Sequence, residues 1–127
     1  MRVRTRNDAL GGSLRPQYEW PKLVKTLGVE QLARRVGISV SSLRRYKAHS
    51  RSTPDDVAAR LHFLAMLVGD LAGAYNDVGI RRWFHRKRSL LGERSPAEIL
   101  AGEWRPDAPG PTQVRQLARS LVAAPAT

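Results

Sequence analysis

The apolar positions between residues 32 and 46 follow a helical period that is broken once, at Gly37. Apolar spacing resumes after the glycine, and Ser39 stands where a helix N-cap belongs. Glycine suits such a turn because it adopts a positive φ without a Cβ clash. The pattern predicts two short helices joined by a tight turn, the arrangement of a helix-turn-helix. The apolar positions that carry it are Leu32, Ala33, Val36, Ile38, Leu43 and Tyr46.

The second helix of this motif has one polar face. Val40, Leu43 and Tyr46 fall on its apolar side, and the remaining positions carry hydroxyl or basic groups. Arginine forks match both guanine edges and phosphates, so we expect this face to bind DNA. The alternative is a helix-turn-helix that serves only for packing within the protein. The candidate DNA-binding residues are Ser41, Ser42, Arg44, Arg45 and Lys47.

No segment of the chain alternates apolar and polar residues as a strand does, so the expected fold class is all-α. One helix is predicted from Pro21 to near Gly28, and another starts at Thr53 as N-cap with Pro54 in its first turn. The second of these has an apolar stripe with a 3.5-residue period, typical of a core helix or a dimer seam. The stripe consists of Val57, Leu61, Leu64, Val68 and Leu71, and Phe63 and Met66 indicate a second buried face.

Three more helices are predicted after residue 74. The first begins around Asn76 and closes at residues 90–92; the second opens with a capping box formed by Ser95 and Glu98. The third begins near Thr112, after a stiff loop rich in proline. The apolar positions of these helices are Ile80, Trp83, Phe84, Leu100, Val114, Leu117, Leu121 and Val122, with Trp83 and Phe84 expected in the core.

These elements divide the chain into four parts. Residues 1–20 are expected to form a flexible basic arm, which either reaches a minor groove through its arginines or binds nothing. Residues 21–52 form the helix-turn-helix region, residues 53–122 a second helical region, and residues 123–127 a loose tail. The arginines of the arm are Arg2, Arg4 and Arg6.

The net charge of +11 is concentrated in the half that holds the helix-turn-helix. Residues 1–53 contain 12 Lys/Arg and three Asp/Glu, a balance of +9, whereas residues 54–127 contain ten and eight, a balance of +2. This asymmetry favours a nucleic-acid footprint over a merely solvated basic surface. The basic run at 81–88 is open to three interpretations: contact with DNA, contact with an acidic partner, or solvation. No apolar run approaches bilayer length and no secretory signal is evident, so we expect a cytoplasmic protein.

The residues give little basis for enzyme chemistry. The chain has no cysteine, and its histidines His49, His62 and His85 lack a metal-ligand spacing. The glycines at 11–12 are not followed by the lysine of a phosphate-binding loop. We therefore expect no catalytic residue, no metal and no cofactor.

A second motif lies between Trp83 and Val122. The tryptophan precedes a basic turn, the sequence Leu-Gly-Glu-Arg-Ser-Pro-Ala-Glu-Ile-Leu at 91–100, and a closing helix with Val114, Leu117 and Leu121. This pattern resembles the C-terminal domain of Xre/MbcA/ParS-type antitoxins, a family that also places a helix-turn-helix ahead of it. The resemblance covers about residues 29–122, with a proline-rich loop where the family usually has a glycine before its closing helix.

The resemblance implies a type II antitoxin that neutralises a RES-domain toxin, which degrades NAD⁺, and represses its own operon. It makes residues 53–122 a toxin-binding or dimerisation domain in a homodimer or a hetero-oligomer with the toxin. Arg115, Arg119 and Val122 are then candidate toxin contacts, although a solvated face explains the two arginines equally well. Two other readings remain: a transcriptional regulator without a toxin partner, and a phage or plasmid partitioning or architectural protein.

Overall fold

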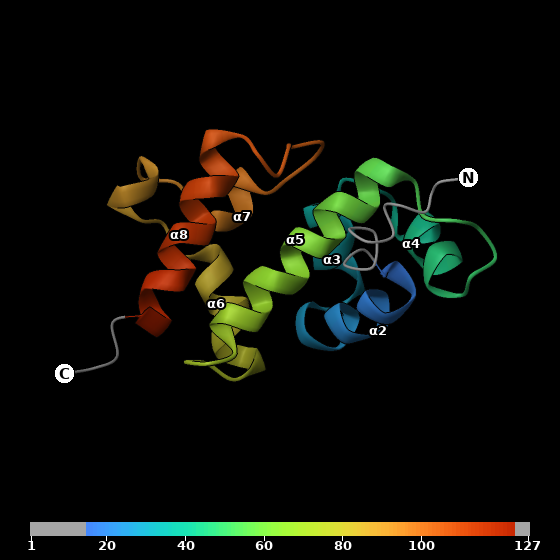
Figure 1. Ribbon diagram of the computed structural model, residues 1–127, viewed down its shortest axis with the longest axis horizontal. Coiled ribbons are helices and arrows are strands. Elements are labelled where there is room, and N and C mark those ends of the chain that lie inside the picture. The colour runs from blue at the N-terminus through green and yellow to red at the C-terminus, as the bar shows by residue number, and fades with distance from the viewer. Residues whose placement is uncertain (1–14, 124–127) are drawn as a thin grey trace.

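The computed structural model describes residues 15–123, and this part of the chain is helical with no strand, as the sequence predicts. Figure 1 shows the longest helix, α5, running through the middle, with α2–α4 towards one end and α6–α8 towards the other. None of the helices in the described range is long and apolar enough to cross a membrane. The elements are α2 (Pro16–Leu27), α3 (Val29–Val36), α4 (Val40–Lys47), α5 (Asp55–Leu71), α6 (Asp77–His85), the 3₁₀ turn η1 (Ser89–Leu91), α7 (Pro96–Ile99) and α8 (Pro109–Ala123).

Helix α5 packs against α2 on one side and α8 on the other, and the buried side chains of all these helices form one continuous cluster. The connection at residues 52–53 therefore joins two regions that share a core. Four of the five residues of the predicted stripe are buried, with Leu61, Leu64 and Leu71 fully enclosed, and Val68 is partly buried. The prediction of a second buried face on this helix is confirmed at Phe63. It is wrong at Met66, which is 40% exposed.

Helix α2 begins at Pro16, five positions before the predicted start at Pro21. Residues 16–20 are thus helical and not part of an arm, while the arginines at 2, 4 and 6 lie outside the described residues. Pro21 lacks the N–H that an interior helical position donates. The helix continues through it because Trp20, Leu23 and Leu27 are buried along one face.

Three predicted helix starts are confirmed by their caps. The Ser39 hydroxyl accepts from the Ser42 N–H, and the Asn76 side chain accepts from the Gly79 N–H. Both halves of the capping box at α7 are present, with the Ser95 hydroxyl and the Glu98 carboxylate each bonding to the other's backbone N–H. Each cap satisfies a backbone donor that has no partner inside its helix.

Three predicted boundaries are wrong. Helix α6 ends at His85 and not at residues 90–92, because extended backbone at Arg86 and Arg88 separates it from η1. Helix α8 begins at Pro109 and not near Thr112, since prolines are tolerated in a first turn whose N–H groups need no helical partner. Ala123, assigned to the tail, is the last residue of α8, and residues 124–127 lie outside the described part.

Candidate nucleic-acid interface

Helix α4 separates its side chains into a buried and an exposed face, as its sequence predicts. Leu43 is fully buried and Tyr46 nearly so, whereas Arg44, Arg45 and Lys47 are exposed. Among residues 15–123, none of these three cations forms an ion pair. Their charges are therefore available to an anionic partner.

The two candidate serines differ in how accessible they are. Ser41 is exposed, whereas Ser42 is half-buried and its hydroxyl accepts a 3.1 Å hydrogen bond from the Ser39 hydroxyl. Ser39 in turn accepts from the Ser42 backbone N–H at 3.0 Å. Ser42 thus belongs to the N-cap of α4, and Ser41 is the freer hydroxyl of the two.

Trp20 fixes the buried face of α4, a role that the sequence analysis missed. Its fully buried ring stacks on Tyr46 with centroids 6.0 Å apart and planes at 24°. Its Nε1–H donates a 3.0 Å hydrogen bond to the hydroxyl of Thr53, so Thr53 ties the connection before α5 to α2. The predicted N-cap role of Thr53 is wrong: Pro54 occupies that position, and no side chain caps α5. The helical spacing of Trp20, Leu23 and Leu27 was the signal available in the sequence.

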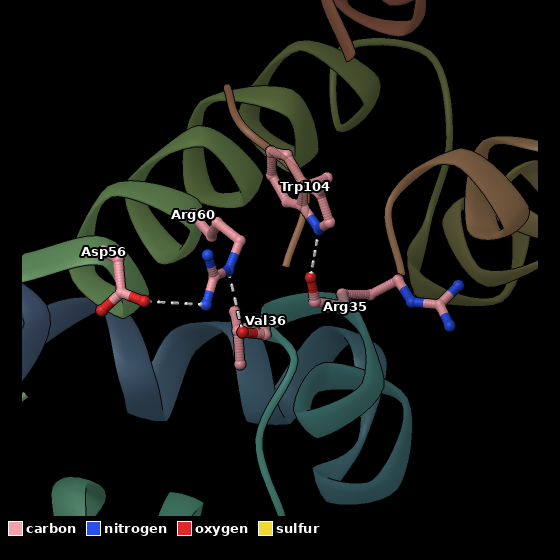
Figure 2. A network of polar contacts seen from close by, with 5 residues as sticks. All are labelled: Arg35, Val36, Asp56, Arg60 and Trp104. Carbon is pink, nitrogen blue, oxygen red and sulfur yellow. Dashed lines mark hydrogen bonds and ion pairs between the residues drawn. The ribbon is translucent and has the colours of Figure 1, made fainter. Parts of the chain in front are cut away.

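Side chains from α5 and from the loop after α7 donate hydrogen bonds to the end of α3, just before the turn to α4, as Figure 2 shows. Arg60 of α5 donates from Nε to the Val36 carbonyl at 2.9 Å and lies 3.5 Å from the Asp56 carboxylate. Trp104 donates from Nε1 to the Arg35 carbonyl at 2.6 Å. These donors satisfy carbonyls that have no partner inside α3 because they belong to its last turn.

Gly37 closes this turn against a second glycine. Its φ of 76° lies in the left-handed region, and a Cβ at this position would overlap the backbone carbonyl of Gly102. The position therefore requires glycine both for its conformation and for a close backbone approach.

The Arg35 side chain points away from α4 and into the protein. Its guanidinium is buried and donates from Nη1 to the Ala97 carbonyl of α7 at 2.8 Å. Burial, and next the charge of Arg34, lower the pKa of Arg35 from its ordinary value. Arg35 thus links α3 to α7 and is not part of the exposed basic face.

The candidate toxin contacts on α8 are partly engaged within the chain. Arg115 donates from Nε to the Asp70 carboxylate at 2.8 Å, and its side chain is only 15% exposed. Arg119 lies 3.9 Å from the same carboxylate and is 61% exposed. The Val122 side chain lies outside the described part of the structure. Of the two arginines, Arg119 is the one that a partner could reach.

The three histidines lie far apart in the sequence and in different surroundings. His62 lies 2.7 Å from Glu19 through Nδ1 and joins α5 to α2, whereas His49 and His85 are exposed. Within residues 15–123, no group of three His, Asp or Glu side chains is placed to hold a metal ion.

Comparison with known proteins gives no relative: no family model, no curated protein and no solved structure matches this chain. The arguments for function therefore come from the residues and from their arrangement. The strongest of these arrangements is the exposed basic face of α4. Trp20 packs against the opposite face of this helix, and the turn before it is held by the Trp104 hydrogen bond and by the close approach of Gly37 to Gly102.

Proposed function

We propose that this protein binds operator DNA through α4 and acts as the antitoxin of a RES-domain, NAD⁺-degrading toxin, repressing its own operon. In this proposal α3 and α4 are the two helices of a helix-turn-helix, and α4 is the recognition helix. The C-terminal helices then form the surface that meets the toxin.

The observation that carries the DNA-binding half is the division of α4 into two faces. Three cations without ion-pair partners in the described range project from a helix whose opposite face is fully packed. A recognition helix needs this combination, because its base-reading side chains must be free while its backbone is held rigidly. Ser41, in the first turn, is suited to a base edge or a phosphate at the end of the helix that enters the groove.

DNA binding is tested with the fragment upstream of the gene and with Arg44→Ala and Arg45→Ala. We expect a loss of about 1–3 kcal/mol and relaxed specificity at one base pair for an arginine that reads a base, and a uniform loss for one that holds a phosphate. Arg105→Ala removes the same charge from an exposed position whose one ion pair within residues 15–123 is with Asp107, and it serves as the matched control. Unchanged binding by both α4 variants would refute the assignment of α4 as recognition helix.

The toxin-binding half is supported by the resemblance at residues 91–100 and by one surface feature. Leu90 is 74% exposed beside a groove of about 310 Å³ between η1 and α8. We place the expected contact with the toxin at this end of the molecule because the exposed Leu90 adjoins the groove. The groove is lined by Leu90, Leu91, Gln113, Gln116, Leu117 and Ser120.

The partner is tested by co-expression with the neighbouring open reading frame, affinity capture and growth rescue. Leu90→Ser and Arg119→Ala are suitable variants, because truncating α8 would remove the buried Val114 and Ala118 from the core. We expect both variants to weaken rescue while leaving operator binding intact. A neighbour without NAD⁺-degrading activity, or a chain captured alone, would refute the antitoxin role.

The second candidate is a transcriptional regulator without a toxin partner, whose C-terminal helices serve for dimerisation. It is favoured by the ion pair between Arg115 and Asp70, which gives one of the two candidate toxin contacts a structural role within the chain. Operator binding by a chain that is captured only with DNA is the result that this candidate requires.

A further inference from the structure

A small pocket beside α6 is lined by three arginines and two aromatic residues. Its volume is about 240 Å³, and it lies where α6 meets the segments on either side of it. No described carboxylate is among its lining residues, which are Tyr75, Gly79, Arg82, Trp83, Arg86 and Arg88. This pocket includes three arginines of the basic run at 81–88, for which the sequence left three interpretations open.

Two residues that line this pocket each carry a buried N–H donor with no acceptor in the described part of the chain. The Trp83 ring is 98% buried, and its Nε1 is one of the few buried polar atoms without a hydrogen-bond partner. The Nε of Arg88 is another. A buried donor without an acceptor carries a desolvation cost, so such groups indicate a ligand, an ion or a water that completes them.

The structure holds Arg88 in place by its backbone and not by a counter-ion. Its N–H donates to the Arg94 carbonyl at 3.1 Å, and its own carbonyl accepts from Glu93 at 2.9 Å. Its guanidinium carbon lies 5.0 Å from the centre of the Trp83 ring. Burial, and next the charge of Arg86, lower the pKa of Arg88, as expected for a cation without a neighbouring anion. The Arg88 guanidinium thus lies against the Trp83 ring with no described counter-ion.

We propose that this pocket binds the phosphate group of a small phosphorylated ligand. Within the described residues Arg82, Arg86 and Arg88 form no ion pair, so none of the three arginines that line the pocket has a described counter-ion. A phosphate monoester carries close to two charges and three acceptor oxygens, whereas a single carboxylate offers one charge and two oxygens. The volume lies below that of pockets for drug-sized ligands and suits a phosphate with a short organic group.

The pocket is separate from the DNA-binding face proposed above and does not depend on it. Helix α6 lies towards the end of α5 opposite α4, as Figure 1 shows. The phosphates of a DNA duplex could also occupy this pocket, so the experiment below tests a DNA duplex separately.

The three tryptophans of the chain provide an internal control for this proposal. The indole N–H groups of Trp20 and Trp104 already donate to Thr53 and Arg35, whereas that of Trp83 has no described acceptor. In a ¹⁵N-labelled sample the three indole signals can be followed separately, and Trp83→Phe assigns the third by its disappearance. The probes are inorganic phosphate, pyrophosphate, malonate and an unrelated DNA duplex, all at an ionic strength held constant with chloride.

We expect phosphate and pyrophosphate to shift the Trp83 indole signal saturably and to leave those of Trp20 and Trp104 in place. Arg82→Ala and Arg86→Ala, both at exposed positions, should each weaken the affinity about tenfold, and Arg105→Ala should leave it unchanged. Three results would overturn the proposal: no shift with either phosphate, an equal shift with malonate, or a shift with the DNA duplex alone.

Discussion

The indole Nε1 of Trp104 donates a 2.6 Å hydrogen bond to the backbone carbonyl of Arg35, a residue 69 positions earlier in the chain. The acceptor belongs to the last turn of α3, where carbonyls have no partner inside the helix. The same indole ring meets Phe63 of α5 edge-on, with centroids 5.0 Å apart. The loop that follows α7 thus caps the helix that precedes the α3–α4 turn, and the geometry of that turn depends on the C-terminal half.

Replacing Trp104 with Phe removes the N–H donor and retains a ring that can contact Phe63. We expect the free energy of unfolding to fall by about 1–3 kcal/mol, because the partly buried Arg35 carbonyl is left without the N–H that donates to it. Urea denaturation measures the loss. Tyr18→Phe, at a position 62% exposed, is the control and should change stability by less than about 0.5 kcal/mol. Equal losses in the two variants would show that the bond between Trp104 and Arg35 contributes nothing.

Substitutions at two glycines with positive φ, Gly28 and Gly37, distinguish the cost of backbone strain from the cost of steric overlap. At Gly28, with φ of 88°, an added Cβ meets nothing within 4 Å, whereas at Gly37 it overlaps the backbone of Gly102. Gly28→Ala should cost about 1–3 kcal/mol for its backbone conformation alone, because the combination of φ 88° and ψ 154° is one that essentially only glycine adopts. Gly37→Ala should cost clearly more, because two backbone segments must also move apart. Thermal unfolding of both variants tests this, and a Gly37 cost no larger than that of Gly28 would contradict the close approach.

The ion pair between Asp70 and Arg115 should stabilise the packing of α8 on α5. Both side chains are largely shielded, so Asp70→Asn leaves a poorly solvated arginine and should cost about 1–3 kcal/mol. Asp107→Asn removes a carboxylate from an exposed pair with Arg105 and should cost about 0–1 kcal/mol. Chemical denaturation of the two variants side by side makes the comparison, and equal values would mean that the partial burial of Asp70 does not matter.

Glu98 should make the stability of the fold depend on pH in the acid range. Its hydrogen bond from the Ser95 backbone N–H lowers its pKa below the ordinary value of 4.5, with Lys87 adding to the effect. A lowered folded-state pKa means that the stabilisation is complete above pH 4.5 and is lost as the pH falls through the folded-state value. We expect Glu98→Gln to flatten the fall in melting temperature below pH 4.5.

The control for this pH profile is Glu103→Gln, since Glu103 is exposed and lies outside the capping box. The profile of this variant should follow that of the unmodified chain. A Glu98→Gln profile that is as steep as the control would refute the role of the carboxylate in the cap.

Local signals in the sequence were sufficient for much of the fold. The caps at Ser39 and Ser95, a helix start around Asn76 and the helix end at Gly28 were predicted, because each depends on groups a few residues apart. The exposed face of α4 was predicted for a similar reason: period alone assigns Leu43 and Tyr46 to one side and the cations to the other.

The errors in the prediction come from long-range contacts. Trp20 was assigned to an arm because Pro21 suggested a helix start, but its burial against Tyr46 and Thr53 outweighs the missing N–H of the proline. The hydroxyl of Thr53 was assigned to a cap, and it accepts from an indole 33 residues earlier instead. Neither partner could be identified from spacing.

The sequence by itself determined an all-helical chain, the position of most helices, and a basic face on α4, because helix period and capping act over one or two turns. Only the tertiary structure decided which polar groups meet across the core. It brought Trp104 and Arg60 to the end of α3 and placed Arg115 against Asp70. It also left the Trp83 indole and the Arg88 Nε, on two residues that line one pocket, without described acceptors. These outcomes depend on how the helices pack, since packing brings together residues whose separation along the chain carries no local signal.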